Sequence, residues 1–450
     1  MAAAPLPDEQ RLTPKGRATR ERIVKAAAEL ILSDGLSAFN MVNVRKAASV
    51  SGSQLAHYFT DKQALIRAVL TRQISVVLDF HRQPALHGLA TFDDFERWIS
   101  LNMRYLRRIG YSGTPTYHAL AGQVAKSDDA TRRTLAAGYW QWVELLEQAI
   151  QRMKDDGVLV ADADPRQLAL VMVIAHQGGG TMTFTYRQEW PHADALRFAV
   201  NYMRLFAAKP ADRNARPPRR HRIRRAAHMV PDEKVTRFGG KGLAIRTRIV
   251  NVAATLMFDH GVAATSLKEL RDSAAVSGSQ LTHYFQDKRD LTRQVIAARR
   301  NDVIAFHTQP KLGSLDSIAA LQVWADACVA DAKTVYRRGG CVYGSLAGEL
   351  LEADDEVLDD LAAGYDEWLE LFRHGLSAMR KRGELRPEAD PRHLAVALVA
   401  AHQGGTMLTY ATGSSEPMRV AANAAVDYVR SLSPAAKAPG TRATRRTKQT

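Results

Sequence analysis

Apolar residues recur every three or four positions along most of the chain, which is the spacing of helices that pack one face against a core. The first such stripe consists of Ile23, Ala26, Ala27, Leu30 and Ile31. The same stripe returns as Ile249, Val252, Ala253, Leu256 and Met257. Each stripe ends near a glycine, Gly35 or Gly261, which is a typical helix stop. No run alternates apolar and polar residues between hairpin turns, so the pattern predicts an all-α protein.

The two stripes belong to a repeat that covers most of the chain. The segment SGSQLAHYFTDK at 51–62 returns as SGSQLTHYFQDK at 277–288, with ten of twelve positions identical and a shift of 226 residues (277 − 51). The register still holds at AHQGG, which occupies 175–179 and 401–405. Solenoid units are only about 20–50 residues long, and a chain of 450 residues is too long for one core. The sequence therefore predicts a tandem duplication of a whole globular unit.

Further helix starts follow the first stripe in each copy. Asn40, Ser51 and Asp61 are good N-cap residues, and Ser266 and Asp287 have the same role in the second copy. The second and third helices are short and are joined by a tight turn, and the fourth is longer. This arrangement predicts a helix-turn-helix head in each copy, with Leu55, Phe59 and their counterparts in its core.

In a helix-turn-helix, the second helix of the pair enters the major groove of DNA and its N-terminal side chains meet base edges. Glutamine can bond an adenine in bidentate fashion and serine can serve either base, while tyrosine and histidine can reach phosphate oxygens. A lysine at the start of the next helix suits a phosphate. The predicted DNA contacts are Gly52, Ser53, Gln54, His57, Tyr58 and Lys62, with Gly278, Ser279, Gln280, His283, Tyr284 and Lys288 in the second copy. The alternative for the histidines and tyrosines is that they only pack.

The net charge of +15 lies almost entirely outside the repeats. Residues 207–241 carry eleven basic and three acidic residues (+8), residues 434–450 carry five basic residues (+5), and residues 1–20 carry four basic and two acidic ones (+2). Basic flexible segments beside folded units suggest arms that hold a polyanion. The alternative is a solvated linker and tail that keep the protein soluble.

Other features narrow the class of protein. Two cysteines, Cys328 and Cys341, argue against a disulfide framework and for a reducing cytosol. The N-terminus lacks an apolar segment of signal-peptide length and no apolar run approaches a membrane span, so we expect a cytoplasmic protein with no membrane partner. No paired carboxylates in a shared motif, metal-ligand spacing, GxSxG or P-loop is present. We therefore expect neither an enzyme nor a cofactor.

The heads resemble the TetR family of bacterial transcriptional regulators. The matching pieces are Ile23…Ala27…Gly35, Ala48-x-Val50-Ser51 and Tyr58-Phe59-x-Asp61-Lys62-x-x-Leu65, and they recur as Ile249…Ala253…Gly261, Ala274-x-Val276-Ser277 and Tyr284-Phe285-x-Asp287-Lys288-x-x-Leu291. Two positions depart from the family pattern. The turn position usually held by glycine is Ser49 or Ala275, where a left-handed turn would be slightly strained. A small residue of the second helix is replaced by Arg45 or Arg271.

The resemblance implies a seven-part organisation. The parts are an N-terminal flexible arm (1–16), head 1 (17–66), helical ligand and dimerisation domain 1 (67–206), a basic linker (207–241), head 2 (242–292), helical domain 2 (293–433) and a basic disordered tail (434–450). We refer to 17–206 as unit 1 and to 242–433 as unit 2. The family forms homodimers whose heads bind a palindrome about one helical turn apart. One chain carries both heads here, so the resemblance implies an intramolecular pseudo-dimer, and a homodimer of chains stays open.

A small-molecule effector would enter the helical domains, and its identity is open. The candidate contacts are Tyr117, His176, Gln177, Tyr343, His402 and Gln403. For the repeated tyrosines and tryptophans, core packing is the favoured alternative to ligand contact. His176 and Gln177 lie in an otherwise apolar helix and need partners, which a ligand, the dimer partner or a backbone carbonyl could supply. The glycines that follow at 178–180 could equally permit close helix packing.

The two heads are not equivalent in charge. Residues 40–47 have a net charge of +2, whereas 266–273 have a net charge of 0. We expect head 1 to contribute more affinity for phosphates. The expected function is a sequence-specific regulator of transcription, with repression as the default that the family resemblance implies. The alternatives are a nonspecific DNA-binding protein that uses its basic arms and a sensor with one DNA-competent head.

Overall fold

The computed structural model of the chain describes residues 12–111, 117–217, 223 and 238–434. Unit 1 contains α1 (Pro14–Ala38), α2 (Met41–Ala47), α3 (Gly52–Tyr58), α4 (Lys62–Arg82), α5 (Phe92–Arg108), α6 (Tyr117–Val124), α7 (Asp129–Asp155), α8 (Pro165–Tyr186) and α9 (Trp190–Arg204). Unit 2 contains α10 (Gly240–His260), α11 (Leu267–Ala274), α12 (Gly278–Tyr284), α13 (Lys288–His307), α14 (Ile318–Asp331), α15 (Val335–Gly339), α16 (Gly344–Glu349), α17 (Asp355–Lys381), α18 (Pro391–Thr412) and α19 (Glu416–Ser431). Short 3-10 helices lie at Pro84–Leu89, Pro210–Arg213 and Pro310–Leu312. Apart from one isolated bridge between Leu159 and Ala207, the regular structure of the described residues is helical, so the prediction of an all-α tandem fold is confirmed.

The predicted helix starts are confirmed in both units. The side chains of Asn40, Ser51 and Asp61 accept hydrogen bonds from the backbone N–H groups three residues further on, at 2.9, 3.1 and 2.7 Å. The equivalent bonds of unit 2, at 3.1, 3.1 and 2.8 Å, are accepted by Ser266, Ser277 and Asp287. Each cap satisfies a backbone donor that a helix start leaves without an intrahelical partner. Local chemistry therefore determines the helix boundaries of both heads.

The first helix of each unit differs from expectation at its ends. α1 begins at Pro14, inside the segment expected to be a flexible arm, because the Thr13 side chain caps the helix and proline suits its first turn. α10 likewise begins at Gly240, within the expected linker. The expected stop at Gly35 is a kink, with φ of 79°, after which α1 resumes for a further turn. In unit 2, Gly261 ends α10 as expected, with φ of 92°.

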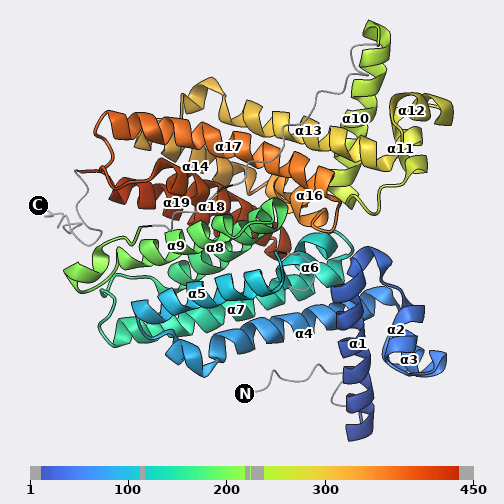
Figure 1. Ribbon diagram of the computed structural model, residues 1–450, viewed down its shortest axis with the longest axis horizontal. Coiled ribbons are helices and arrows are strands. Elements are labelled where there is room, and N and C mark those ends of the chain that lie inside the picture. The colour runs from blue at the N-terminus through green and yellow to red at the C-terminus, as the bar shows by residue number, and fades with distance from the viewer. Residues whose placement is uncertain (1–11, 112–116, 218–222, 224–237, 435–450) are drawn as a thin grey trace, which may run out of the picture.

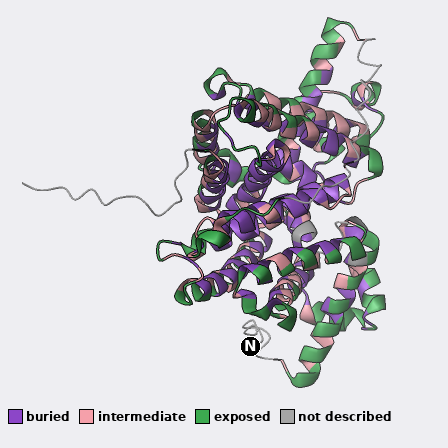
Figure 2. Ribbon diagram, turned by 60° about the vertical axis from the view of Figure 1, so that its left-hand side comes forward, coloured by how far each residue is buried: buried purple, intermediate pink, exposed green. Residues whose placement is uncertain are grey.

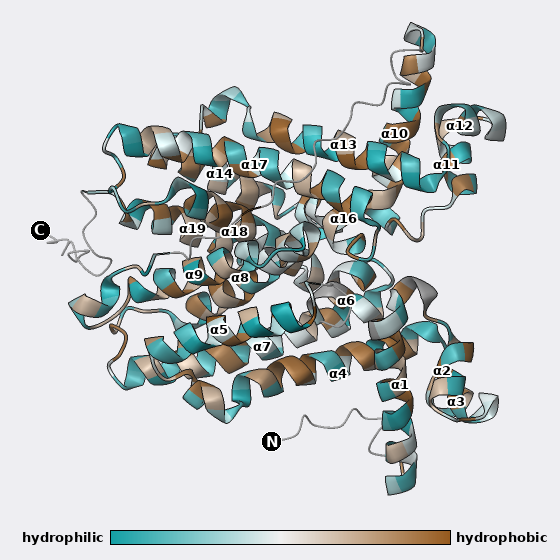
Figure 3. Cartoon of the chain, viewed as in Figure 1, coloured by the Kyte–Doolittle hydropathy of each residue, from teal (hydrophilic) through white to brown (hydrophobic). Residues whose placement is uncertain are grey.

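α8 and α18 cross at the centre of the molecule, and the buried residues of both units join in one core around them (Figures 1 and 2). A Cβ atom added at Gly178 would lie 1.9 Å from the carbonyl oxygen of Ala400, and one added at Gly404 would lie 2.0 Å from that of Ile174. The two contacts are equivalent in the 226-residue register. The glycines therefore permit close backbone approach between the units, which was one of the two expectations for this glycine run. Figure 3 colours the view of Figure 1 by hydropathy and shows apolar residues along outer helices such as α4 as well as at the centre.

Both heads project from the same side of the molecule, and α3 and α12 are their outermost helices (Figure 1). Each head also touches the opposite unit. Lys126, two residues beyond α6, donates to the carbonyl oxygen of Met257 near the end of α10, at 3.3 Å. Glu352, at the equivalent position of unit 2, accepts from the backbone N–H of Leu36 near the end of α1, at 3.0 Å. The helical domain of each unit thus supports the head of the other.

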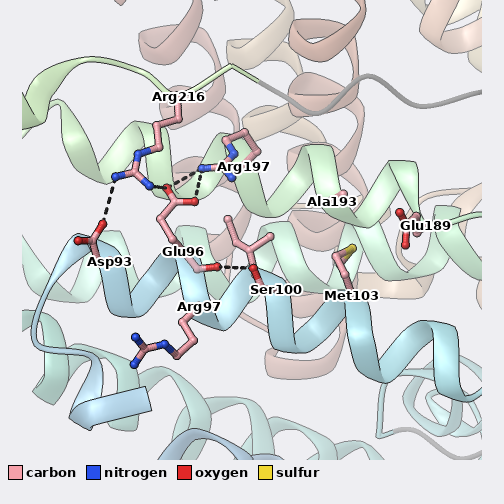
Figure 4. Close-up of a pocket in the computed structure, with 10 residues that line it drawn as sticks. Asp93, Glu96, Arg97, Ser100, Met103, Glu189, Ala193, Arg197 and Arg216 are labelled. Atoms are coloured by element: carbon pink, nitrogen blue, oxygen red, sulfur yellow. Dashed lines mark hydrogen bonds and ion pairs between the residues drawn. The ribbon is translucent and has the colours of Figure 1, made fainter. Parts of the chain in front are cut away.

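The first part of the basic linker is bound to unit 1. Arg216 forms an ion pair of 3.1 Å with Asp93 and lies 3.6 Å from Glu96, which also pairs with Arg197 at 2.6 Å (Figure 4). The backbone N–H of Arg216 donates to Asn201 at 3.0 Å. The charged side chains of these pairs line a groove of 420 Å³ between α5 and α9. Because its charged groups pair with one another, the groove anchors the start of the linker. The start of the predicted linker is thus bonded to unit 1 through Arg216, and residues 218–222 and 224–237 lie outside the described residues.

Candidate nucleic-acid interface and effector cavity

The recognition helices α3 and α12 expose most of the side chains predicted to meet DNA. Gly52, Ser53, Gln54 and His57 are exposed, and Tyr58 is half-buried. The equivalent exposed residues of α12 are Ser279, Gln280 and His283, while Gly278 and Tyr284 are half-buried. Leu281, Phe285 and their unit 1 counterparts Leu55 and Phe59 are buried, as expected for core residues. Each head therefore offers a short polar helix end of the kind that a major groove admits.

The side chain of Gln54 is turned back onto its own helix. Its Oε1 accepts from the backbone N–H of Ser51 at 3.0 Å, and together with the Ser51 cap this forms a capping box. Gln280 and Ser277 form the same box, at 2.9 Å. Bidentate pairing with adenine needs both the carbonyl and the amide group of a glutamine. Reading a base with Gln54 therefore requires its side chain to leave the capping box.

The turns before the recognition helices have left-handed backbone. Ser49 has φ of 50° and Ala275 has φ of 49°. A residue with a Cβ atom adopts this conformation at a cost of about 1–2 kcal/mol. The departure from glycine therefore leaves the turn geometry intact, with the slight strain that the sequence predicts.

The lysines at the start of the fourth helix lie differently in the two heads. Lys62 places its ammonium 5.4 Å from the centre of the Phe39 ring. Lys288 donates to the carbonyl oxygen of Ala263 at 3.5 Å, and burial lowers the pKa of its ammonium. The Lys288 charge is therefore held against its own head, which makes it less available to a phosphate.

Unit 1 contains a cavity of 210 Å³. It lies among α4, α5, α7 and α8, and Arg108 at its edge is exposed. Apolar and aromatic side chains provide much of its lining, and the polar groups besides Arg108 include the amides of Gln73, Asn102 and Gln177 and the imidazoles of His81, His176 and His192. An apolar cavity with a few polar groups is typical of small-molecule sites. The principal apolar residues are Val77, Phe80, Leu106, Trp142 and Phe184.

The structure places the predicted residues Tyr117, His176 and Gln177 around this cavity. Nε2 of His176 lies 3.1 Å from Oδ1 of Asn102, and Oε1 of Gln177 accepts from the Tyr139 hydroxyl at 3.4 Å. The expected partners were a ligand, a dimer partner or a backbone carbonyl, and the structure supplies side chains of unit 1 instead. The Nε2 donor of Gln177 is buried and has no hydrogen-bond partner among the described residues. An unsatisfied buried donor costs about 1–3 kcal/mol, so a ligand with an acceptor group would gain from binding there.

The predicted tyrosines are bonded to backbone. The hydroxyl of Tyr117 donates to the carbonyl oxygen of Leu135 at 2.8 Å, and that of Tyr343 donates to Leu361 at 2.6 Å. Both side chains are buried. Tyr117 can therefore offer a ligand its ring, whereas its hydroxyl proton is already used.

A buried histidine that sequence reasoning missed holds the wall of the cavity. Nδ1 of His81 donates to the carbonyl oxygen of Val77 at 2.7 Å, and Nε2 accepts from the indole N–H groups of Trp98 and Trp142 at 3.0 and 3.2 Å. Burial lowers the pKa of His81 to about 4, so the imidazole is neutral. His307 makes the equivalent bonds in unit 2, with its pKa also lowered to about 4 by burial. The expectation that the tryptophans are core residues is confirmed, and the shared register of the histidines is the signal that could have found them.

The predicted effector residues of unit 2 are bonded to side chains of the same unit. Nε2 of His402 lies 3.0 Å from the hydroxyl of Tyr336. Oε1 of Gln403 accepts from Tyr365 at 3.1 Å, and its Nε2 donates to the sulfur of Cys341 at 3.7 Å. Gln403 also borders a space of 40 Å³ that residues of both units line, little more than the roughly 30 Å³ that one water molecule occupies. His402 and Gln403 are therefore bonded within unit 2.

Two helix-turn-helix heads on a duplicated helical body define the class: a helix-turn-helix regulator built twice in one chain. The family model for bacterial regulatory proteins of the tetR family matches residues 23–69 and again 249–295. A model for the tetracyclin repressor-like C-terminal domain matches residues 317–425. These matches cover both heads and the helical domain of unit 2, and they support a TetR-family regulator with two tandem units.

Individual relatives resemble parts of the chain. The HTH-type transcriptional repressor KstR2 of Rhodococcus jostii (strain RHA1) is 27% identical over 77 residues, which cover 17% of this chain and 38% of that protein. The regulatory protein TetR from Rhodobacter sphaeroides is 20% identical, with a TM-score of 0.38, and covers 41% of this chain and 98% of its own. The reduced form of NemR from E. coli is 18% identical, with a TM-score of 0.37, and covers 44% of this chain and 100% of its own.

Within the described residues, no helix has both the length and the apolar character that crossing a membrane requires.

Proposed function

We propose that the chain is a ligand-responsive regulator of transcription, by default a repressor, that binds a near-palindromic operator with both heads. The observation that carries the proposal is the pair of nearly identical recognition helices on one side of the molecule (Figure 1). They differ at one position, Ala56 against Thr282. Similar helices read similar half-sites, and heads related by an approximate two-fold axis read them in inverted order. The DNA contacts are those predicted from the sequence in α3, α12 and the helix starts that follow.

The two units of one chain would act as a pseudo-dimer, and the charges at their contact favour pairing between unlike units. Lys126 of unit 1 forms a buried ion pair of 2.8 Å with Glu349 of unit 2. The equivalent positions are Glu352 and Gln123. Two copies of unit 2 would therefore place Glu352 opposite Glu349, and two copies of unit 1 would place Lys126 opposite a neutral Gln123. Carboxylates brought together without cations are unfavourable when buried, so either self-pair lacks the complementarity of the pair within the chain.

A second contact follows the same rule. Arg187 of unit 1 forms ion pairs with Asp355 and Asp359 of unit 2. Its equivalent is Gly413, and the equivalents of Asp355 and Asp359 are Asp129 and Arg133. Two copies of unit 1 would therefore replace one of the two carboxylates near Arg187 with a cation, whereas two copies of unit 2 would have no cation at this place. Exposed ion pairs of this kind add little to the free energy of association. They matter because they disfavour the wrong partner.

The test of the function is selection of genomic DNA fragments by the purified chain at near-physiological salt, followed by sequencing. Two similar inverted arms in the selected fragments would support a regulator that uses both heads. A single enriched arm would mean that one head reads DNA. Recovery without sequence preference would replace the proposal with nonspecific binding by the basic arms, which predicts a steep dependence on salt.

Paired variants separate the contributions of the heads. We expect Gln54→Ala with Lys62→Ala to weaken operator binding more than Gln280→Ala with Lys288→Ala. Lys288 is already held against its own head, and Lys268 is neutralised by Asp272 at 3.0 Å. The double variant of unit 1 should also have a shallower plot of log affinity against log salt concentration. The magnitude of the slope should fall by about 1, which is the contribution of one phosphate contact. Equal losses from the two pairs of variants would contradict unequal heads.

A further inference from the structure

The cavity of unit 1 has a counterpart in unit 2 that the chain itself occupies. Asn102 and His176 line the cavity and bond to each other at 3.1 Å. Their equivalents are Cys328 and His402, and both are buried against Tyr336. The Tyr336 hydroxyl bonds His402 at 3.0 Å, and its ring stands perpendicular to the imidazole with the centres 5.4 Å apart. A phenol ring therefore fills the region that in unit 1 borders open space.

The residue that provides this ring has no counterpart in unit 1. The position equivalent to Tyr336 is Gly110, which has φ of 64° and would have no atom within 4 Å of an added Cβ. Unit 2 also closes the region by exchanging Gly180 for Thr406. In addition, Gln403 donates to Cys341, whereas the equivalent amide donor of Gln177 lacks a described partner. Unit 2 thus satisfies this amide internally, whereas in unit 1 the buried amide donor of Gln177, a residue that lines the cavity, has no partner among the described residues.

We propose that the chain binds one effector, in unit 1 alone, and that Tyr336 is a built-in substitute for the effector in unit 2. This inference rests on the effector site of the proposed function, and it specifies how many such sites the chain has and which class of ligand they bind. The effector is a neutral single-ring compound that carries a hydrogen-bond acceptor. The ring follows from the phenol that fills unit 2, and the acceptor follows from the Gln177 donor.

The size and polarity of the cavity agree with this class of compound. A cavity of about 150 Å³ suffices for benzene, so 210 Å³ admits one ring with a short polar substituent. The charged side chain in the lining, Arg108, is exposed at the edge. The deep groups include the amides of Asn102 and Gln177, the indole of Trp142 and the imidazole of His81, which burial keeps neutral, and none of these offers a buried counter-charge. An ionised ligand would therefore lose hydration without compensation.

The test is a calorimetric titration of the full-length chain with acetophenone, which has one ring and one carbonyl acceptor, and with ethylbenzene as the matched probe without the acceptor. We expect one acetophenone per chain and binding about tenfold weaker for ethylbenzene, as the loss of one buried hydrogen bond implies. Gln177→Leu should weaken acetophenone by a similar factor, and Gln403→Leu, the matched change in unit 2, should leave it unchanged. Two equivalent sites, no acetophenone binding, or equal effects of the two variants would overturn the inference.

Removing the built-in ring provides the converse experiment. Tyr336→Gly places the unit 1 residue in unit 2, and we expect this chain to gain a second site that takes p-cresol, the excised side chain. Tyr336→Phe retains the ring and should not gain a second site, and retention of the unit 1 site in Tyr336→Gly shows that the glycine variant is folded. If Tyr336→Gly remains folded and takes no additional p-cresol, the substitution model is wrong. These titrations contain no DNA, so they test the effector site separately from the proposed function. If the chain selects inverted operator arms but binds two probe molecules, the proposed function stands and the single-site inference is wrong. If the chain binds one probe molecule but selects no operator, the single-site inference stands and the proposed function is wrong.

Discussion

Replacing Gly178 with alanine tests whether α8 and α18 hold the two units in one fixed register. The added Cβ would lie 1.9 Å from the carbonyl oxygen of Ala400. Carbon–oxygen contacts between helices settle at about 3.3–3.6 Å. Rotation of a side chain cannot relieve a clash between Cβ and backbone, so the two helices must separate by roughly 1 Å or more. The perturbation therefore acts on the whole contact between the units.

The expected magnitude follows from two opposing effects. Overpacking a core costs about 1–3 kcal/mol, and a backbone clash belongs at the upper end of this range. Alanine is favoured over glycine in a helix by about 1 kcal/mol. We expect Gly178→Ala to lower the free energy of unfolding by about 2 kcal/mol, and Gly404→Ala, with its 2.0 Å contact to Ile174, to do the same. The double variant should lose less than the sum, because the separation that the first Cβ forces also makes room for the second.

Urea unfolding followed by tryptophan fluorescence measures these losses. Gly242→Ala is the matched control, because its Cβ would meet its nearest neighbour at an ordinary 3.4 Å. We expect this control to be at least as stable as the parent chain, because alanine is favoured over glycine in a helix and the added Cβ meets no clash. If Gly178→Ala is as stable as the control, or if the losses of the double variant are strictly additive, the argument for a rigid crossing is refuted.

Two further predictions concern stability. Burial holds the folded pKa values of His81 and His307 at about 4, below the unfolded value of about 6.5, so the unfolded chain takes up protons first as pH falls. Each histidine should lower the free energy of unfolding by about 2 kcal/mol between pH 7 and pH 5. Asp194 opposes this change, because burial raises its pKa to about 7. We expect the two histidines together to outweigh Asp194, so equal free energies of unfolding at pH 7 and pH 5 in urea unfolding would contradict the prediction. Ser49→Gly and Ala275→Gly should each raise the thermal midpoint, since glycine relieves about 1 kcal/mol of left-handed strain, and a lowered midpoint in calorimetry would show that these turns are not strained.

Much of each head could be predicted because its structure is determined over short distances. Asn40, Ser51 and Asp61 sit directly before the helices that they cap, and a cap needs only the backbone three residues further on. The capping box of Gln54 could also have been found, since serine followed three residues later by glutamine is its signature. Sequence reasoning instead assigned Gln54 to a base edge, because the same side chain can perform either task.

The helical domains were less predictable because their contacts join residues that are distant in the sequence. The repeat register marks His81 and His307 as a pair, but no local pattern reveals the two indoles that each imidazole accepts. Tyr336 was harder still, since it has no partner in unit 1 and a comparison of the copies reports only a glycine there. The different chemistry of the two effector regions depends on which side chain fills the space, and periodicity does not encode this.

The support that each domain gives to the opposite head has a consequence for how this protein can change. In a homodimer a mutation appears on both sides of the axis at once, so every new residue must suit both places. Lys126 and Glu352 occupy the same register with opposite charge, one serving a carbonyl and the other an N–H group of the opposite head. Because the two copies are fused in one chain, a residue can change in one copy without changing in the other, and Lys126 and Glu352 differ in this way. Dividing the chain into separate genes would restore a symmetry that its residues no longer match.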